Sequence, residues 1–271
     1  MRPLITAIAL AAGLVLGASV QAEGVHLHND KCSFGTDYDV RVQPDGVSFE
    51  RDDGTPGQVF MHDGALRVDG RDVAVSAADA ARLREYEGRV RRLLPEVAAI
   101  AREGVDIGFG ALTTVVATFA DQPAERSRLT AELNAQHRQA LANVDNGLGQ
   151  GVWRKHSVED LMEHQVGDAV STLVSTVTAQ AVKAALSGDQ RQVAALEARA
   201  GTLDKAIDRE VDARADRLGE RADALCPQLA RLDELQQQFQ FRLRDGSRLA
   251  LVDRQAGHDN EASAKTKPEA R

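Results

Sequence analysis

The apolar residues of this chain change their spacing at Ser76, and this change divides the protein into two structurally different parts. Before it, Tyr38, Val40 and Val42 alternate with polar residues, as in a half-buried β-strand. After it the spacing is helical, with apolar residues at Leu83, Tyr86, Val90 and Leu94. We therefore predict an α+β protein, mostly α, in which a small N-terminal antiparallel β-meander precedes a bundle of long helices.

Turn signals separate the short strands that we predict within residues 23–76. Pro44-Asp45-Gly46, Asp63-Gly64 and Asp69-Gly70 are such signals, because Pro presets φ and Gly tolerates a positive φ. The predicted strands are residues 38–42, 47–50, 59–61, 65–68 and 72–75.

The helical body is predicted over residues 77–251. Ser76 and Asp79 form a capping pair at its start, and Pro95 either kinks the first helix or begins a second one. Residues 107–120 carry no charge. This stretch is short for a membrane span, so we expect an interior helix, with a membrane-inserting hairpin as the alternative.

Two further helices are predicted at 123–144 and 157–187, followed by a long helical region over 189–242. In this last region, apolar or small residues recur in alternating steps of four and three, except for consecutive fours between Leu203 and Ala215. This is a coiled-coil-like seam with one stutter. Pro227 should kink the helix beside Cys226. The main seam residues are Leu196, Leu203, Ile207, Val211, Leu218, Leu225 and Leu232.

The first residues have the composition of a secretory signal peptide. Arg2 supplies a positive charge, Leu4–Leu16 is a nearly unbroken apolar run, and Ser19–Ala22 offers small residues for cleavage. We expect residues 1–22 to be removed and the mature chain to have no transmembrane segment. The alternative is an uncleaved N-terminal membrane anchor. The net charge of −8, without a Lys/Arg cluster, argues against nucleic acid as a partner.

The chain contains two cysteines, Cys32 and Cys226. Two thiols in an exported protein usually pair, and their wide spacing fits neither a CxxC redox motif nor a zinc knuckle. We therefore expect a Cys32–Cys226 disulfide, with two separate buried thiols as the alternative.

The order of these features is similar to that of a known family. An export signal, an early cysteine, a short β region with Asp-Gly turns, a helical body and a late cysteine follow one another. In this layout the chain resembles the YggN-like family of uncharacterised bacterial cell-envelope proteins, from Cys32 to about Leu251. The resemblance implies a periplasmic protein of a Gram-negative bacterium and implies no catalytic residues. The polar tail, residues 252–271, should be disordered.

Two groups of residues are candidate metal ligands. His26 and His28 lie two apart near the predicted mature N-terminus, where they could share a metal ion. His156, Asp160 and His164 would lie on one face of a helix. Solvated side chains explain both groups more simply, so we expect no metal and no cofactor.

The sequence contains no GxSxG, HExxH or phosphate-loop motif. We therefore expect a non-enzymatic interaction or structural protein of the envelope, whose partner is an unknown envelope protein or a second copy. The alternative is a hydrolase or metal-dependent enzyme whose site is assembled from scattered residues.

Overall fold

The computed structural model describes residues 26–29, 32–155 and 190–254, together with scattered positions between 167 and 186. These residues form the predicted α+β, mostly α fold, with an antiparallel sheet that precedes long helices. The predicted signal peptide, most of the predicted helix at 157–187 and the tail from 255 onward lie outside the described residues.

The predicted β-meander is confirmed. Asp63-Gly64 and Asp69-Gly70 have positive φ at both residues, the conformation that a two-residue hairpin turn requires. A short strand that the sequence did not predict, β8 (Val152–Trp153), adds to the meander beside β3, so that the spatial order is β7-β6-β5-β4-β3-β8. The meander strands are β3 (Asp39–Gln43), β4 (Gly46–Glu50), β5 (Gln58–His62), β6 (Ala65–Val68) and β7 (Arg71–Val73).

A second, three-stranded sheet joins the two ends of the described chain. Strand β1 (His26–Asn29) pairs with β2 (Cys32–Gly35), and β2 pairs with β9 (Asp253–Arg254). Phe34 lies opposite Arg254, whose guanidinium is 5.0 Å from the centre of the Phe34 ring. Strand β2 also contacts helix α8 (Cys226–Gln237).

Helix α2 (Ala77–Phe119) runs through the centre of the fold. Ser76 caps it as predicted, because its Oγ accepts a hydrogen bond from the Asp79 backbone N–H at 3.1 Å. Pro95 lies within the continuous helix and does not begin a second one. None of the described helices combines enough length and apolarity to cross a membrane.

Helix α3 (Pro123–Asn146) packs against the second half of α2 around a separate apolar core. The prediction that residues 107–120 form an interior helix is wrong in part. Phe109, Val116 and Ala120 are buried in the core shared with α3, whereas Gly110, Thr113 and Ala117 are exposed.

The predicted long C-terminal helix is divided into shorter pieces. It consists of α6 (Gln190–Ile207), a π-helical turn η3 (Asp208–Asp212), α7 (Ala213–Asp223) and α8. The π turn η3 lies within the predicted stutter, where its wider turn accommodates the change in the spacing of the seam residues. Pro227 lies in the first turn of α8, directly after the break between α7 and α8.

The expectation that this helix continues to Arg242 is wrong, because α8 ends at Gln237. Beyond it, Phe239, Phe241 and Leu243 are buried, whereas the residues between them are exposed. This alternation belongs to an extended segment. The chain then turns back, and Leu251 and Val252 become buried beside α8.

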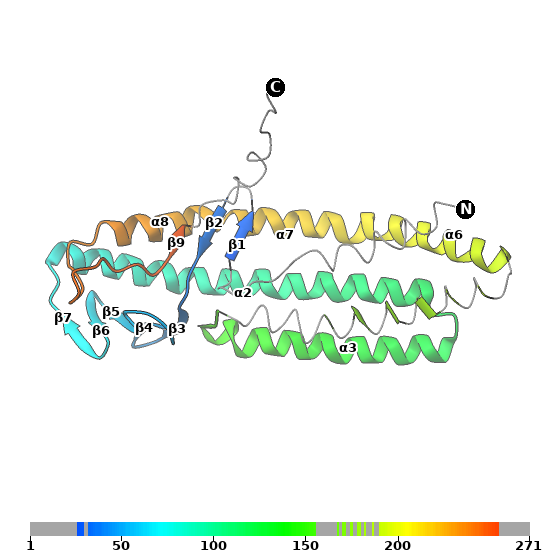
Figure 1. Cartoon of the computed structure of the whole chain (residues 1–271), viewed down its shortest axis with the longest axis horizontal. Helices are drawn as coiled ribbons and strands as arrows, with labels where there is room; N and C mark the ends of the chain where they lie inside the picture. The colour runs from blue at the N-terminus through cyan, green and yellow to red at the C-terminus, as the bar shows by residue number, and fades with distance from the viewer. Residues whose placement is uncertain are drawn as a thin grey trace, which may run out of the picture.

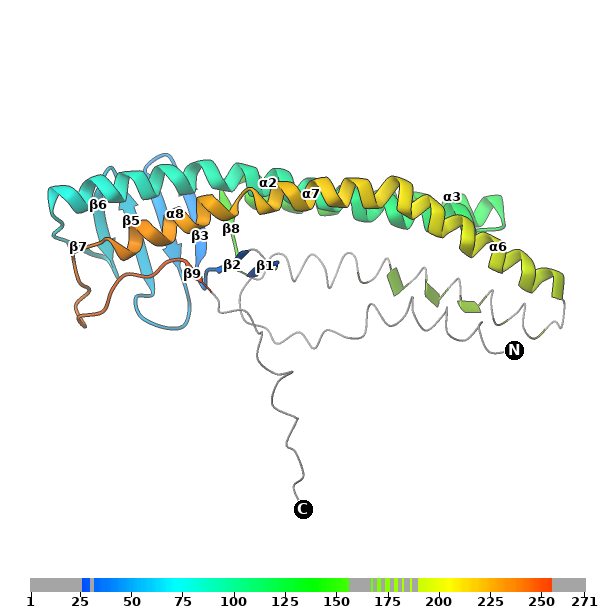
Figure 2. The same cartoon turned by 90° about the horizontal axis from the view of Figure 1, so that it is seen from above.

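The helices lie side by side along one long axis, with α2 between α3 and the α6–α8 stretch (Figure 1). The meander lies at one end of α2, and Figure 2 draws it below that helix. The main core fills the space between the meander, α2, α8 and the extended segment.

The seam of α6–α8 faces α2 of the same chain. Polar pairs between the α6–α8 stretch and the α2 segment follow one another in antiparallel order along the two, and they fix how the two are aligned. They join Glu85 to Arg231, Glu96 to Gln228, Glu103 to Arg214 and Arg221, and Asp121 to Arg199.

The seam residues differ in burial, and their burial determines how much a substitution lowers the free energy of unfolding. Leu203 and Leu218 are only half-buried, and a Cβ at Gly104 would lie 3.7 Å from Leu218 Cδ2. We expect Leu203→Asp with Leu218→Asp to lower the free energy of unfolding by about 2 kcal/mol, measured by urea denaturation.

The matched control is Thr202→Asp with Gly219→Asp. These adjacent positions are exposed, and nothing lies within 4 Å of a Cβ at Gly219, so this pair should leave stability nearly unchanged. If the Leu203 and Leu218 variants instead kept wild-type stability and only changed the sedimentation of the protein, the seam would be an interface between chains.

Candidate functional site

The face of the meander that is turned toward α2 carries a row of buried side chains from different strands. Val40 on β3 lies opposite Phe49 on β4 in the strand register, and it also lies opposite Trp153 on β8. The Phe49 ring is 6.2 Å from the ring of Tyr86 on α2, centre to centre. The row therefore runs from Tyr86 through Phe49 and Val40 to Trp153.

A cavity of about 120 Å³ lies along this row. Its lining comes from both sheets, α2, α7, α8 and the residues before β9, and none of the described residues that line it is charged. The apolar side chains of the lining are Phe34, Val40, Phe49, Val90, Leu93, Leu94, Val97, Ile100, Ala222, Leu225, Leu229, Leu232, Leu251 and Val252. Such a lining favours an apolar occupant.

Two lining residues carry buried polar atoms that have no hydrogen-bond partner within the described part of the chain. These atoms are the hydroxyl oxygen of Tyr86 and the indole Nε1 of Trp153. A third polar lining residue, Thr36, has a partner: its Oγ1 accepts a hydrogen bond from the backbone N–H of Tyr38 at 3.2 Å. Unsatisfied buried donors are rare in proteins, because each costs about 1–3 kcal/mol.

The protein's two tyrosines form a natural comparison. The hydroxyl of Tyr38 donates a hydrogen bond to the backbone oxygen of Pro56 at 3.1 Å, whereas that of Tyr86 has no such partner. Burial raises the pKa of Tyr38 to about 12, although Arg51 opposes the shift, and burial also raises the pKa of Tyr86. Both side chains are therefore neutral near pH 7.

We expect opposite effects when each hydroxyl is removed. Tyr38→Phe should lower the free energy of unfolding by about 1 kcal/mol, because it removes a buried hydrogen bond. Tyr86→Phe should leave stability unchanged or raise it by up to about 1 kcal/mol, because it removes an unsatisfied group. Urea denaturation of both variants checks this. An equal loss in the two would mean that the Tyr86 hydroxyl is satisfied in the free protein.

The amide of Gln236 holds one wall of the cavity in place. Its Oε1 accepts hydrogen bonds from the backbone N–H groups of Leu251, at 2.8 Å, and Val252, at 3.2 Å. Its Nε2 donates to the backbone oxygen of Val252. Because Leu251 and Val252 line the cavity, this one side chain fixes that wall to α8.

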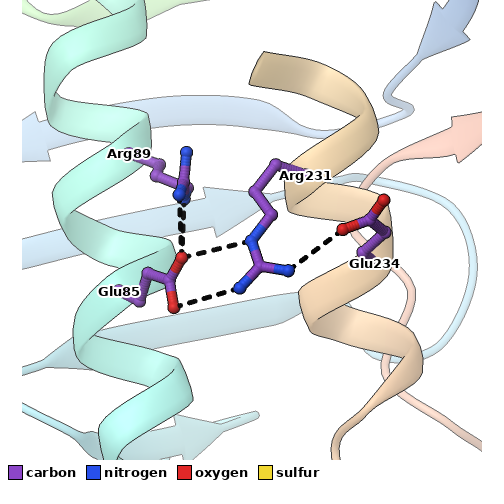
Figure 3. A network of polar contacts seen from close by, with 4 residues as sticks. All are labelled: Glu85, Arg89, Arg231 and Glu234. Atoms are coloured by element: carbon purple, nitrogen blue, oxygen red, sulfur yellow. Dashed lines mark hydrogen bonds and ion pairs between the residues drawn. The ribbon is translucent and has the colours of Figure 1, made fainter. Parts of the chain in front are cut away.

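An ion-pair network joins α2 to α8 (Figure 3). Glu85 accepts hydrogen bonds from Arg89 on its own helix and from Arg231 on α8, and Arg231 also binds Glu234. The hydrogen bond from Arg89, followed by that from Arg231, lowers the pKa of Glu85. The network is partly exposed, so its main effect is to fix the register of the two helices.

The predicted metal ligands do not form a described site. His26 and His28 lie on β1, whereas His156, Asp160 and His164 lie outside the described residues. Among the described residues, no group of three or more potential ligand side chains could hold a metal ion.

Cys32 begins β2 and Cys226 begins α8, two elements that are in contact. The structure therefore brings the backbones of the two predicted disulfide partners into neighbouring elements. Cys226 packs against the main core.

Sequence analysis missed one histidine–carboxylate pair between α2 and α3. His137 Nε2 is 2.7 Å from Asp106 Oδ1, and the His137 ring lies 5.2 Å from that of Phe109, centre to centre. Neither His137 nor Asp106 lines the cavity. The pair links α2 to α3.

Comparison with known proteins gives one family match. The model of a family described as "Protein of unknown function (DUF2884)" matches residues 32–252. Every residue that lines the cavity falls within this range. No curated protein and no solved structure matches the chain.

Proposed function

The chain belongs to this family of unknown function, DUF2884, and we propose that it is a non-enzymatic binding protein that holds an apolar group in the cavity between its meander and α2. The apolar, uncharged lining is the observation that carries the proposal. Catalysis of acyl or phosphoryl transfer needs charged or nucleophilic groups at the bound substrate, and none of the described lining residues is charged.

We also propose that the protein works in the periplasm, as a YggN-like envelope protein. The apolar run Leu4–Leu16 and the small residues of Ser19–Ala22 support export. Mass spectrometry of the protein from periplasm tests this proposal: the mature chain should start near Glu23, and intact Met1 on the purified protein would contradict it.

A metal-dependent or hydrolytic function is the second candidate. It rests on His156, Asp160 and His164, whose spacing of four residues would place them on one face if they lie on one helix. Zinc titration of the mature protein by calorimetry separates the two candidates. Saturable binding that is lost in His156→Ala with His164→Ala would favour the enzyme.

The single tryptophan of the chain makes the binding proposal directly measurable, because Trp153 lines the cavity. Bromine quenches indole fluorescence on contact, so 1-bromohexane is the probe and hexane is its non-quenching competitor. We expect saturable quenching of Trp153 by 1-bromohexane, reversed by hexane.

A pair of variants on α2 controls for unspecific quenching. Val97→Phe adds volume to a lining position, whereas Val115→Phe adds the same volume on the same helix beside the α2–α3 core. Saturable quenching should be lost in Val97→Phe and kept in Val115→Phe. Linear quenching of equal strength in all three proteins would overturn the proposal.

A further inference from the structure

The two unsatisfied polar atoms of the lining restrict the chemistry of the occupant. An indole N–H can only donate a hydrogen bond, and the neutral Tyr86 hydroxyl can donate one. A hydrocarbon would fill the cavity but would leave both groups unsatisfied. An occupant with hydrogen-bond acceptors would satisfy them.

The size and charge of the cavity restrict the occupant further. Its volume of about 120 Å³ is close to that of an engineered cavity of about 150 Å³ that binds benzene. One ring or a chain of about six carbons therefore fits. An ionised carboxylate would lose its hydration without gaining a charged partner from the described lining residues.

The two donors also lie at different depths. Tyr86 is fully buried, Phe49 and Val40 follow it along the row, and Trp153 at the other end is partly exposed. Acceptors can thus be bound at either end of this row.

We propose that the cavity takes a small, neutral carbonyl compound, or the carbonyl-bearing end of a larger apolar molecule, whose oxygen accepts a hydrogen bond from Tyr86 or Trp153. This inference rests on the proposed binding function. A carbonyl oxygen accepts hydrogen bonds and carries no proton, so it satisfies either donor without adding an unsatisfied donor of its own.

The first test compares hexane with 2-hexanone, which have nearly the same shape, on the full mature protein. With one tryptophan in the chain, the indole N–H gives one resonance in a ¹H–¹⁵N spectrum. We expect 2-hexanone to shift this resonance strongly downfield and hexane to shift it weakly. Equal small shifts with both ligands would overturn the role of Trp153.

The second test uses Tyr86→Phe, which keeps the ring and removes the hydroxyl, with Tyr38→Phe as the matched control outside the lining. Tyr86→Phe should weaken 2-hexanone binding about three- to ten-fold and leave hexane binding unchanged. Tyr38→Phe should change neither. Unchanged 2-hexanone binding in Tyr86→Phe would overturn the role of Tyr86.

The two ligands also separate this inference from the binding function on which it rests. If hexane fails to bind saturably to the wild-type protein, the proposed function fails. If hexane binds but 2-hexanone neither shifts the indole resonance nor responds to Tyr86→Phe, the cavity is a site for hydrocarbon alone and only the carbonyl inference fails.

Discussion

Gln236→Ala is expected to lower the free energy of unfolding by about 2–4 kcal/mol, measured by urea denaturation. The Gln236 amide makes three hydrogen bonds to the backbone of Leu251 and Val252, and all three are buried. Removing it leaves two N–H groups and one carbonyl without partners away from water. Each such loss is more costly than the net value of an ordinary hydrogen bond.

The adjacent Gln237 is the matched control. It is exposed, and its Nε2 donates only to Asp233 at 2.9 Å. Gln237→Ala should therefore change stability by less than about 0.5 kcal/mol. Equal effects of the two substitutions would show that the amide of Gln236 does not hold Leu251 and Val252 in place.

The same substitution should impair binding more than stability alone explains. In Gln236→Ala, the residues before β9 lose their attachment to α8, and Leu251 and Val252 no longer form a fixed wall. We expect saturable quenching of Trp153 by 1-bromohexane to weaken even at temperatures where the variant is fully folded.

The elements with strong local patterns could be predicted from the sequence. The alternation around Val40 and the Asp-Gly turns specify the meander, and the Ser76–Asp79 capping pair marks the start of α2. The position of the stutter also marks the π turn η3. In each case the residues that determine the structure are neighbours in the sequence.

The end of α8 could not be predicted in the same way. No Gly or Pro follows Gln237 closely, and the change to period two at Phe239 and Phe241 is short. What holds the extended segment is distant: the backbone N–H of Gln240 donates to Asp79 Oδ1 at 3.1 Å, and Phe239 lies 6.2 Å from Tyr86, ring centre to ring centre. These contacts exist only once the chain has folded.

The cavity was missed for the same reason. Its lining joins β2 to residues more than two hundred positions later, and Tyr86 had been placed in an ordinary helical apolar face. The local patterns place Tyr38 in a strand and Tyr86 in a helix, but they do not indicate whether either hydroxyl has a hydrogen-bond partner. The distinction appears only when the hydrogen-bond partners of the two hydroxyls are known.

Loss of the proposed Cys32–Cys226 disulfide should have the largest effect on stability. In the chain-entropy model, closing a loop of this length stabilises the folded state by up to about 5 kcal/mol. The contact between β2 and α8 and the absence of a free cysteine among the described residues support the pairing. Cys32→Ser with Cys226→Ser should therefore lower the denaturant midpoint strongly.

A reductant provides the control within the same experiment. It should lower the midpoint of the wild-type protein toward that of the double variant and leave the double variant itself unchanged, because no disulfide remains to be reduced. The two elements that carry the cysteines also line the cavity, since β2 supplies Phe34 and α8 supplies Leu229. Reduction should thus also weaken 1-bromohexane binding. Native wild-type protein that reacts fully with a maleimide at both cysteines would contradict the pairing.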